Sequence, residues 1–221
     1  MKFSNLLSKL ISIQSEPFEE IIGYDHIKRL FRMALDSDSA IHILLVGPPA
    51  SAKTMFLTSL MQLKNTYFSD GANSTKAGMI DYVLEKRPRY LLIDEIDKMS
   101  SKDHIFLLNL METGIISETK YGKTRSAQIK TSVFATSNNI ERLSAPLRSR
   151  FFIVELGPYT YEQFFEITKQ LLSHKKIERE VANLIASTVW VKSQDIRDCI
   201  KIASMAKTIE DVDFLVNMLE V

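Results

Sequence analysis

The segment with the clearest chemical meaning is a short loop between an apolar run and a helical run. The loop follows residues 41–46 and reads Gly47-Pro48-Pro49-Ala50-Ser51-Ala52-Lys53-Thr54. Backbone N–H groups of such a loop, with the N-terminus of the following helix, can bind a phosphate. Lys53 is placed to reach the β- and γ-phosphates of a nucleotide, and Thr54 to ligate magnesium. The glycine usual before this lysine is Ala52, which adds only a methyl group.

Two carboxylates follow a second apolar run. Residues 89–97 read RYLLIDEID, so Asp94 and Glu95 lie at the carboxyl end of a predicted buried strand. That end of the sheet is where α/β folds bind ligands. We predict that Asp94 holds the magnesium shell and that Glu95 polarises the attacking water. The alternative is an ordinary strand-end cap, but the position about 40 residues after the phosphate loop favours a shared site.

Three further segments supply polar groups for the same chemistry. Asn138 ends the segment FATSN and can orient water beside Glu95, although asparagine here is also typical of a turn. Arg148 and Arg150 lie in PLRSRF, just before another predicted strand. Phosphoryl transfer needs positive charge at the γ-phosphate, often from a neighbouring subunit, whereas the alternative is solvated surface arginine. Arg197 lies in DIRD at the start of a helix and could also reach nucleotide.

Strands and helices alternate along the first part of the chain. Strands are predicted at 41–46, 89–93, 133–136 and 151–155, and helices at 26–35, 53–63, 74–85 and 102–111. This alternation implies an α/β fold, a parallel sheet with helices on both faces. Helical periods predominate after Gly157-Pro158. We therefore predict an N-terminal amphipathic helix within 1–17, an α/β core at 18–157 and a small all-helical domain at 158–221.

The composition is typical of a globular protein. The 221 residues are 45% apolar and 25% charged, and a chain of this length can bury a core without disulfides or structural metal. The net charge of +1 provides no global attraction to nucleic acid or anionic lipid, so such binding needs a local patch. Cys199 is the single cysteine and cannot form an internal disulfide. No apolar run approaches the roughly 18 residues of a membrane span, so we expect no membrane partner and a cytoplasmic location.

A predicted β-hairpin at 115–131 supplies local charge. It turns near Tyr121-Gly122 and carries four basic residues against Glu118 alone. Adjacent basic residues on a loop can follow a phosphate backbone, whereas the alternative is a solvated hairpin tip. The candidate nucleic-acid contacts are Lys120, Lys123 and Arg125.

These elements, in this order, resemble the AAA+ ATPases over roughly residues 18–221. The resemblance implies a P-loop NTPase core with a helical lid, ATP and Mg²⁺ as cofactors, and ATP hydrolysis. Lys53 and Thr54 match the Walker A motif, and Asp94 and Glu95 match Walker B. The nucleotide-binding residues that it implies are Ile22, Gly23, Gly47, Pro48, Pro49, Ala50, Ser51, Ala52, Lys53, Thr54 and Met55.

The resemblance also assigns the remaining polar residues. Asn138 matches sensor 1 and Arg197 matches sensor 2. Arg148 and Arg150 flank the arginine-finger position, which serves the nucleotide of a neighbouring subunit, and either of the two could be the finger. An alanine before the P-loop lysine is also seen in MCM helicases and MoxR-type chaperones.

Within the family, the LRSRF segment and the hairpin are most similar to branch-migration motors of the RuvB type. This likeness implies a homo-oligomeric ring, with a hexamer favoured, that acts on DNA through the hairpin. Those motors carry a DNA-binding domain after the lid, whereas this sequence ends at Val221, so a separate DNA-binding or adaptor subunit is a further expected partner. The alternatives are a MoxR-like protein remodeller and a slow ATP-dependent switch.

Overall fold

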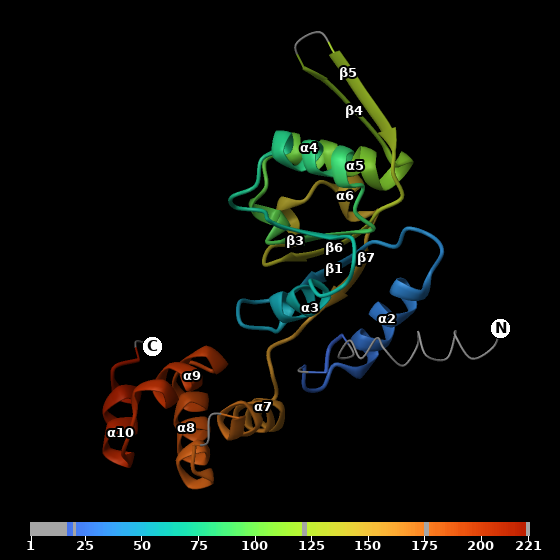
Figure 1. Cartoon of the computed structure of the whole chain (residues 1–221). Helices are drawn as coiled ribbons and strands as arrows, with labels where there is room; N and C mark the ends of the chain where they lie inside the picture. The colour runs from blue at the N-terminus through green and yellow to red at the C-terminus, as the bar shows by residue number, and fades with distance from the viewer. Residues whose placement is uncertain (1–16, 20, 121–122, 175–176, 220–221) are drawn as a thin grey trace, which may run out of the picture.

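The computed structural model describes residues 17–19, 21–120, 123–174 and 177–219 (Figure 1). The predicted N-terminal helix therefore lies outside the described residues, apart from the turn at 17–19. None of the helices in the described ranges is both long and apolar enough to cross a membrane.

The centre of the molecule is a sheet of five parallel strands. They are β1 (Ile43–Val46), β2 (Thr66–Asp70), β3 (Tyr90–Asp94), β6 (Ser132–Ser137) and β7 (Phe152–Glu155), in the spatial order β2-β3-β6-β1-β7. In register, Val46 pairs with Ser137 and Asp70 pairs with Asp94. The carboxyl ends of the strands consequently meet at one edge, as predicted for a parallel α/β sheet.

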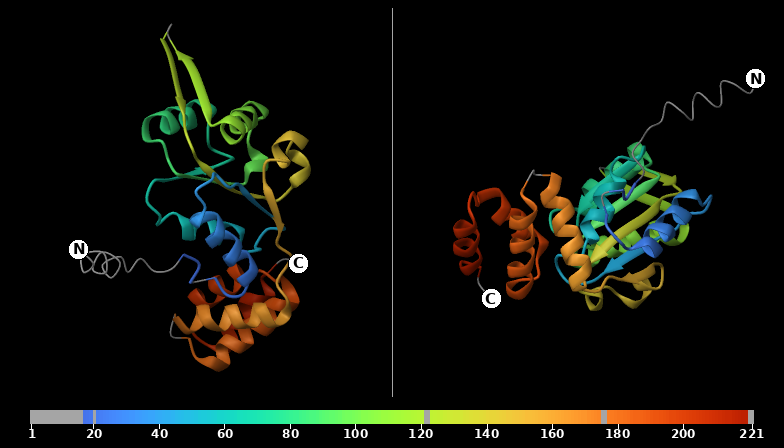
Figure 2. Two further views of the ribbon diagram at one scale, coloured as in Figure 1. Left: turned by 90° about the vertical axis from the view of Figure 1, so that its right-hand side faces the viewer. Right: turned by 90° about the horizontal axis from the view of Figure 1, so that it is seen from below.

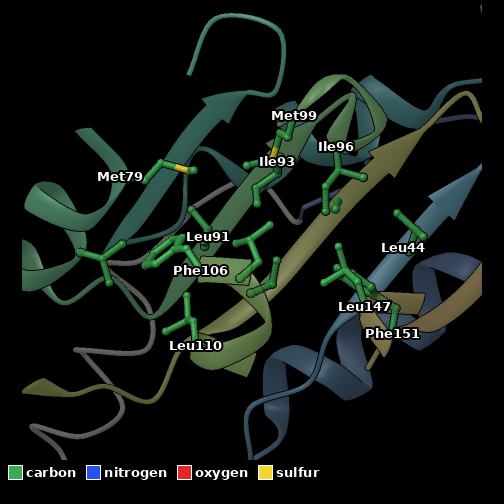
Figure 3. Packing of buried hydrophobic residues seen from close by; sticks show 14 of the residues in the cluster. Leu44, Met79, Leu91, Ile93, Ile96, Met99, Phe106, Leu110, Leu147 and Phe151 are labelled. Atoms are coloured by element: carbon green, nitrogen blue, oxygen red, sulfur yellow. The ribbon is translucent and has the colours of Figure 1, made fainter. Parts of the chain in front are cut away.

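Alternate residues of the strands supply two apolar cores. Leu44 and Leu91 enter a core on one face of the sheet, whereas Leu45 and Leu92 enter a core on the other. All four side chains are fully buried. Successive side chains of a strand point to opposite faces, so a sheet covered on both sides requires apolar residues at every position. Figure 3 shows the first of these cores, where Phe106 and Met79 pack against the strands.

Helices cover both faces of the sheet. Helices α4 (Lys76–Lys86), α5 (Ser101–Thr113) and α6 (Ala145–Arg148) lie over one face, and α2 (Asp25–Asp36) and α3 (Lys53–Leu60) over the other (Figure 1). Two short 3-10 helices, η1 (Ile96–Lys98) and η2 (Ile140–Arg142), follow β3 and β6. Ser100 is the N-cap of helix α5, and its side chain forms a capping box with Asp103.

Two sequence expectations differ from the structure. Strand β2 was not predicted, because Tyr67 and Phe68 sit among polar residues and the strand is only partly buried at the edge of the sheet. The helix predicted at 74–85 begins later, at Lys76, and Thr75 caps it by accepting a hydrogen bond from the Gly78 amide. Ser74 instead hydrogen-bonds the Ser69 side chain at the end of β2.

The predicted hairpin is present and projects from the body of the molecule (Figure 1). Strand β4 (Ile115–Lys120) pairs antiparallel with β5 (Lys123–Gln128), and Glu118 is opposite Arg125. At its base, Gly114 has a φ of 69°, and a Cβ there would lie 2.5 Å from the Ile129 carbonyl oxygen. Only glycine fits this left-handed, crowded position.

The C-terminal helices form a separate apolar cluster. They are α7 (Tyr161–His174), α8 (Arg179–Lys192), α9 (Ile196–Met205) and α10 (Ile209–Asn217). Figure 2 shows them gathered on one side of the core. The cluster includes Phe164, Val189 and Ile202, and Ile22 and Tyr159 pack against it from the core side. We propose that residues 158–221 act as a distinct lid domain.

His42 is a half-buried imidazole that links strands of the sheet. Its Nδ1 accepts a hydrogen bond from the Val133 amide at 3.0 Å, and its carbonyl accepts one from the Phe152 amide at 2.8 Å. Burial lowers the pKa of His42 from 6.5 to about 4, and a backbone hydrogen bond at Met111 partly offsets this effect. Because the folded state favours the neutral ring, its contribution to stability is complete above the unfolded pKa of 6.5 and is lost as pH falls toward about 4.

We expect the free energy of unfolding to fall more steeply with acidification in the wild type than in His42→Gln. The difference between the two slopes should amount to about 1–3 kcal/mol between neutral and acidic pH. Urea unfolding at several pH values measures it. The exposed His26 provides the control, since His26→Gln should keep the wild-type slope. Parallel curves for wild type and His42→Gln would contradict the assignment.

Candidate functional site

The loop between β1 and α3 folds around the Lys53 ammonium. Lys53 Nζ donates hydrogen bonds to the carbonyls of Gly47 at 2.9 Å and Pro48 at 2.6 Å, and to Ser51 Oγ at 3.1 Å. The side chain is only 6% exposed. Burial lowers the pKa of Lys53, while the nearby carboxylates of Asp94 and Glu95 act in the opposite direction. A cation is thus held inside the loop that was predicted to bind phosphates.

Two alanines give this loop its shape. Ala50 has a φ of 64° and Ala52 a φ of 54°, both left-handed. This conformation costs an L-residue about 1–2 kcal/mol, which glycine avoids. The departure from glycine at position 52 therefore costs strain, beyond the added methyl group that the sequence suggested. The Ala52 methyl packs in the core, which offsets part of the cost.

Gly47 has a separate steric reason to be glycine. A Cβ there would lie 2.3 Å from the Leu156 carbonyl oxygen, where the loop leaves β1 alongside the end of β7. No side chain could be added without moving backbone.

Asp94 is the centre of a hydroxyl and carboxylate cluster. Thr54 Oγ1 donates to both Asp94 carboxylate oxygens, at 3.1 and 3.2 Å. The Thr136 hydroxyl also donates to Asp94, and it accepts a hydrogen bond from the Glu95 amide at 2.9 Å. A hydroxyl and a carboxylate are oxygen ligands of the kind that Mg²⁺ prefers, usually one or two from protein with the rest from water and phosphates. The donor set therefore fits the expected ion.

No group of three or more His, Cys, Asp or Glu side chains that could hold a metal occurs within the described ranges.

The side chains of Glu95 and Asn138 are joined by a hydrogen bond. Asn138 Nδ2 donates to Glu95 Oε1 at 2.9 Å, and the Asn138 amide donates to Asp97 Oδ1 at 3.1 Å. Glu95 follows β3 with a left-handed φ of 52°. This turn is strained for glutamate, and such strain is concentrated at functional sites. A polarised water beside Glu95 would have an amide donor next to it.

One cavity of about 310 Å³ joins these groups. Its polar wall contains the loop together with Asp94, Glu95, Thr136 and Asn138. Its apolar wall comes from the segment just before α7 and from the lid helices, and consists of Tyr159, Ile167, Leu171, Ile196 and Ile200. The polar wall suits phosphates, and the apolar wall suits a flat base. The shape therefore fits a nucleotide that spans the core and the lid.

Arg197 reaches the cavity from the lid. Its backbone amide and its guanidinium both donate to the carboxylate of Asp195, which caps α9. This hydrogen bond raises the pKa of Arg197, so the guanidinium stays charged. Arg197 and Lys53 both line the cavity, and the positive charge of Arg197 contributes to lowering the pKa of Lys53.

Four of the residues predicted to bind nucleotide lie outside the cavity lining. Ile22, Gly23, Gly47 and Pro48 are absent from its lining in the part of the chain that the structure describes. Gly23 has a left-handed φ of 71°, and Ile22 packs against the lid cluster. The segment that contains Ile22 and Gly23 thus brings the core into contact with the lid.

Arg148 and Arg150 are not brought to the cavity of their own chain. Arg148 forms an ion pair with Glu141 at 3.2 Å, and Arg150 with Glu112 at 2.9 Å. Neither arginine belongs to the cavity lining that the described residues provide.

Of the three candidate nucleic-acid residues, the structure describes the side chain of Arg125. Its guanidinium pairs with Glu118 on β4 and with Asp81 on α4. The two carboxylates offset its charge, which reduces its expected share in phosphate binding. The side chains of Lys120 and Lys123 lie outside the described residues.

Several site residues were missed by sequence reasoning. Thr136 connects Asp94 to the Glu95 amide, yet a threonine inside an apolar strand carries no signal of that role. The lid residues had a signal that was not used. Ile167 and Leu171 are four residues apart, as are Ile196 and Ile200, which places each pair on one helix face.

Comparison with known families and structures adds independent evidence. A sequence model described as the MCM P-loop domain matches residues 12–149, more than half of the chain. The chain is 27% identical over 174 residues to the zygotic DNA replication licensing factor mcm6-A of Xenopus laevis, with 64% of this chain and 21% of that protein covered. It is 29% identical over 180 residues to the probable DNA helicase MCM9 of Arabidopsis thaliana, with 67% and 28% covered.

The chain thus spans about a fifth to just over a quarter of these curated relatives. Among solved structures, a mutant of Thermotoga maritima RuvB matches with a TM-score of 0.71 and 25% identity, covering 92% of this chain and 73% of that one. The structure described as the Thermotoga maritima RuvB Holliday junction branch migration motor matches with a TM-score of 0.67 and 24% identity, covering 92% and 72%. These matches show that the core and the helical lid share one fold with RuvB.

Proposed function

Because this chain belongs to the MCM P-loop domain family, within the AAA+ ATPases, we propose that it hydrolyses Mg-ATP between its core and its lid and applies the cycle to DNA. One observation carries the proposal. The Thr54–Asp94 and Glu95–Asn138 hydrogen bonds lie along the wall of a single cavity that also contains Lys53. Binding, metal-ligating and water-orienting groups are thereby within reach of one nucleotide.

The side chains have distinct tasks in this proposal. Lys53 turns from its loop carbonyls to the β- and γ-phosphates, where charge-assisted hydrogen bonds are strong. Thr54 and Asp94 would hold the magnesium ion, which would supply positive charge to offset that of the phosphates. Glu95 accepts a hydrogen bond from the attacking water, and Asn138 fixes its orientation. Arg197 stabilises phosphate charge from the lid.

The positions of Arg148 and Arg150 are an argument that the enzyme works as an oligomer. Arg148 and Arg150 lie outside their own cavity, in weak ion pairs at the surface. We propose that one of them completes the cavity of a neighbouring copy in a ring, for which the family likeness favours a hexamer.

The case for DNA comes from the relatives. One curated relative is named as a DNA replication licensing factor and the other as a probable DNA helicase. The RuvB structure is described as a branch migration motor. The hairpin is the element we propose to contact DNA, since it projects from the core and carries Lys120 and Lys123 next to its turn. A separate DNA-binding or adaptor subunit remains part of this proposal.

The first test separates nucleotide binding from chemistry. Lys53→Ala should lower Mg-ATP affinity about tenfold or more, because each missing charge-assisted hydrogen bond is worth about 1.5–3 kcal/mol. Glu95→Gln should retain affinity and lose about 10²–10⁴ in turnover. Calorimetry and a phosphate-release assay measure the two. The exposed Lys64 supplies the control, since Lys64→Ala should leave both unchanged. If Lys53→Ala bound ATP as tightly as the wild type, the assignment of the loop as the phosphate-binding site would be wrong.

The second test concerns assembly. An arginine finger is worth about 10³–10⁵ in rate, so turnover per chain should rise with protein concentration. Mixing Lys53→Ala chains with Arg148→Ala/Arg150→Ala chains should restore activity, since some interfaces then combine an intact loop with intact arginines. A chain carrying all three substitutions, mixed in the same way with Lys53→Ala chains, should restore none. Turnover by a monomer that is independent of concentration would exclude a finger in trans.

The third test addresses DNA. Lys120→Ala/Lys123→Ala should weaken duplex binding similarly for all sequences and lower the salt slope by about 0.9 for each phosphate that the protein no longer neutralises. Arg125→Ala should change the slope less, because Asp81 and Glu118 already offset its charge. Lys86→Ala, on α4, controls for the removal of an exposed cation. The measurement is DNA affinity at several salt concentrations with a non-hydrolysable ATP analogue. An unchanged slope in the double variant would favour a protein substrate.

A further inference from the structure

Strands β3 and β6 are neighbours in the sheet (Figure 1), but their backbone pairing ends before the residues of the site begin. The paired residues run from Tyr90, opposite Ser132, to Ile93, opposite Ala135. On its other side, β6 stays paired with β1 as far as Ser137. Hydrogen bonds other than those of the sheet must therefore hold the ends of β3 and β6 together at the site.

Side chains form those hydrogen bonds. The Glu95 amide donates to the Thr136 hydroxyl at 2.9 Å, and the Asn138 side chain donates to Glu95 Oε1 at 2.9 Å. The backbone amide of Asn138 donates to Asp97 Oδ1 at 3.1 Å. Asn138 is thus held at two points, by its side chain and by its backbone. The proposed mechanism gives Glu95 and Asn138 a task but gives none to Asp97.

Asp97 is a buried residue outside the nucleotide cavity. It is 7% exposed, and it does not belong to the cavity lining that the described residues provide. Burial of a carboxylate is costly unless hydrogen bonds replace those to water, and a buried backbone amide likewise needs an acceptor. The bond between Asp97 and the Asn138 amide meets both needs. Asp97 can therefore influence the chemistry through Asn138 without touching a nucleotide.

The short helix η1 gives Asp97 a rigid support. The preceding residue, Ile96, is fully buried in the core beneath α5. The carbonyl of Ile96 accepts a hydrogen bond from Nε2 of His104 on α5 at 3.0 Å, and His104 is itself buried. A functional group is held accurately when the residues that support it are fixed by packing and hydrogen bonds. Asp97 meets that condition.

We propose that Asp97 is a positioning residue that holds Asn138 opposite Glu95. Oδ1 of Asp97 fixes the backbone of Asn138, and this backbone sets where the Asn138 side chain meets the Glu95 carboxylate. The face of Glu95 that is open to the attacking water is fixed as a result. An acceptor oxygen is required for this task, whereas a negative charge is not. The inference rests on the proposed roles of Glu95 and Asn138 and identifies what sets their geometry.

The first experiment removes the acceptor but keeps the size of the side chain. Asp97→Leu should lower kcat for ATP about 5- to 100-fold, the range expected when a buried amide loses its partner. Asp97→Ala, which adds no bulk, should do the same. Asp97→Asn keeps Oδ1 and should stay within about twofold of the wild-type kcat. The affinity for a non-hydrolysable ATP analogue should be unchanged in all three, because Asp97 lies outside the cavity lining.

Asp103→Ala separates positioning from loss of stability. Asp103 is 6% exposed, and its carboxylate caps α5 by hydrogen bonds to the amide and hydroxyl of Ser100. Its removal should lower the free energy of unfolding, as Asp97→Ala does, but should leave kcat at the wild-type value. Urea unfolding and circular dichroism measure the stability of each variant. If Asp103→Ala lowers kcat as much as Asp97→Ala, the effect is one of stability and the inference is wrong.

The second experiment tests whether Asp97 acts through Asn138. In an Asn138→Ala background, Asp97→Leu should cause no further loss of kcat, because no side chain is left to position. Single-turnover phosphate release measures these slow rates. An equal loss in both backgrounds would show that Asp97 acts elsewhere. Equal kcat values in Asp97→Asn and Asp97→Leu would also overturn the inference, whatever the rate of Asn138→Ala.

The outcomes distinguish this inference from the proposed function. If the wild type hydrolyses ATP and Glu95→Gln does not, but Asp97→Leu and Asp97→Ala keep the wild-type kcat, the positioning role is wrong and the active site stands. If the wild type itself shows no turnover with Mg-ATP at any protein concentration, the proposed function is wrong, and the positioning role is wrong with it.

Discussion

The parallel pairing of β3 with β6 is the interaction on which the site depends. It brings the ends of these two strands to the same edge, so Asp94 and Glu95 from one strand meet Thr136 and Asn138 from the other. These residues are about 40 positions apart in the chain, and no local structure could align them. Any shift in register by one residue would turn their side chains to the opposite face. The buried apolar residues of both strands hold that register in place.

The lid contributes the other half of the cavity. Its helices have their own apolar cluster, and the contacts of Ile22 and Tyr159 connect that cluster to the core. A nucleotide between the two parts would touch the rigid sheet edge with its phosphates and the lid with its base. Binding energy could therefore act on the angle between the parts. Arg197 lies on the lid side of the cavity, where its guanidinium would bind a phosphate of that nucleotide.

Backbone strain is concentrated where chemistry is expected. Ala50, Ala52 and Glu95 adopt left-handed conformations that glycine would accept more easily. At Glu95 this conformation has a visible consequence, since it directs the following turn so that Lys98 returns to the carboxylate. The same residue receives the close approach of Gly71. Glu95 is thus surrounded by an amide, an ammonium and a backbone contact from a surface loop.

The amino-acid sequence determined the local features of this protein. Continuous apolar runs in β1, β3 and β6 predicted strands buried on both faces, and the residues that end them predicted the edge where ligands bind. The roles of Lys53 and Thr54 could be predicted because the residues that form the phosphate-binding loop are contiguous in the sequence. Strand β2 was not, because an edge strand that is only partly buried lacks a continuous apolar pattern.

Only the tertiary structure decided contacts between distant residues. Thr136 bonds Asp94, the lid closes the apolar end, and Arg125 is neutralised by Asp81 from a separate helix. Lys98 could have pointed to solvent, and its place on Glu95 follows from one backbone angle. Spacing in a sequence records which groups share a helix face or a strand. It does not record which strands pair or which turns are left-handed, since these depend on packing of the whole chain.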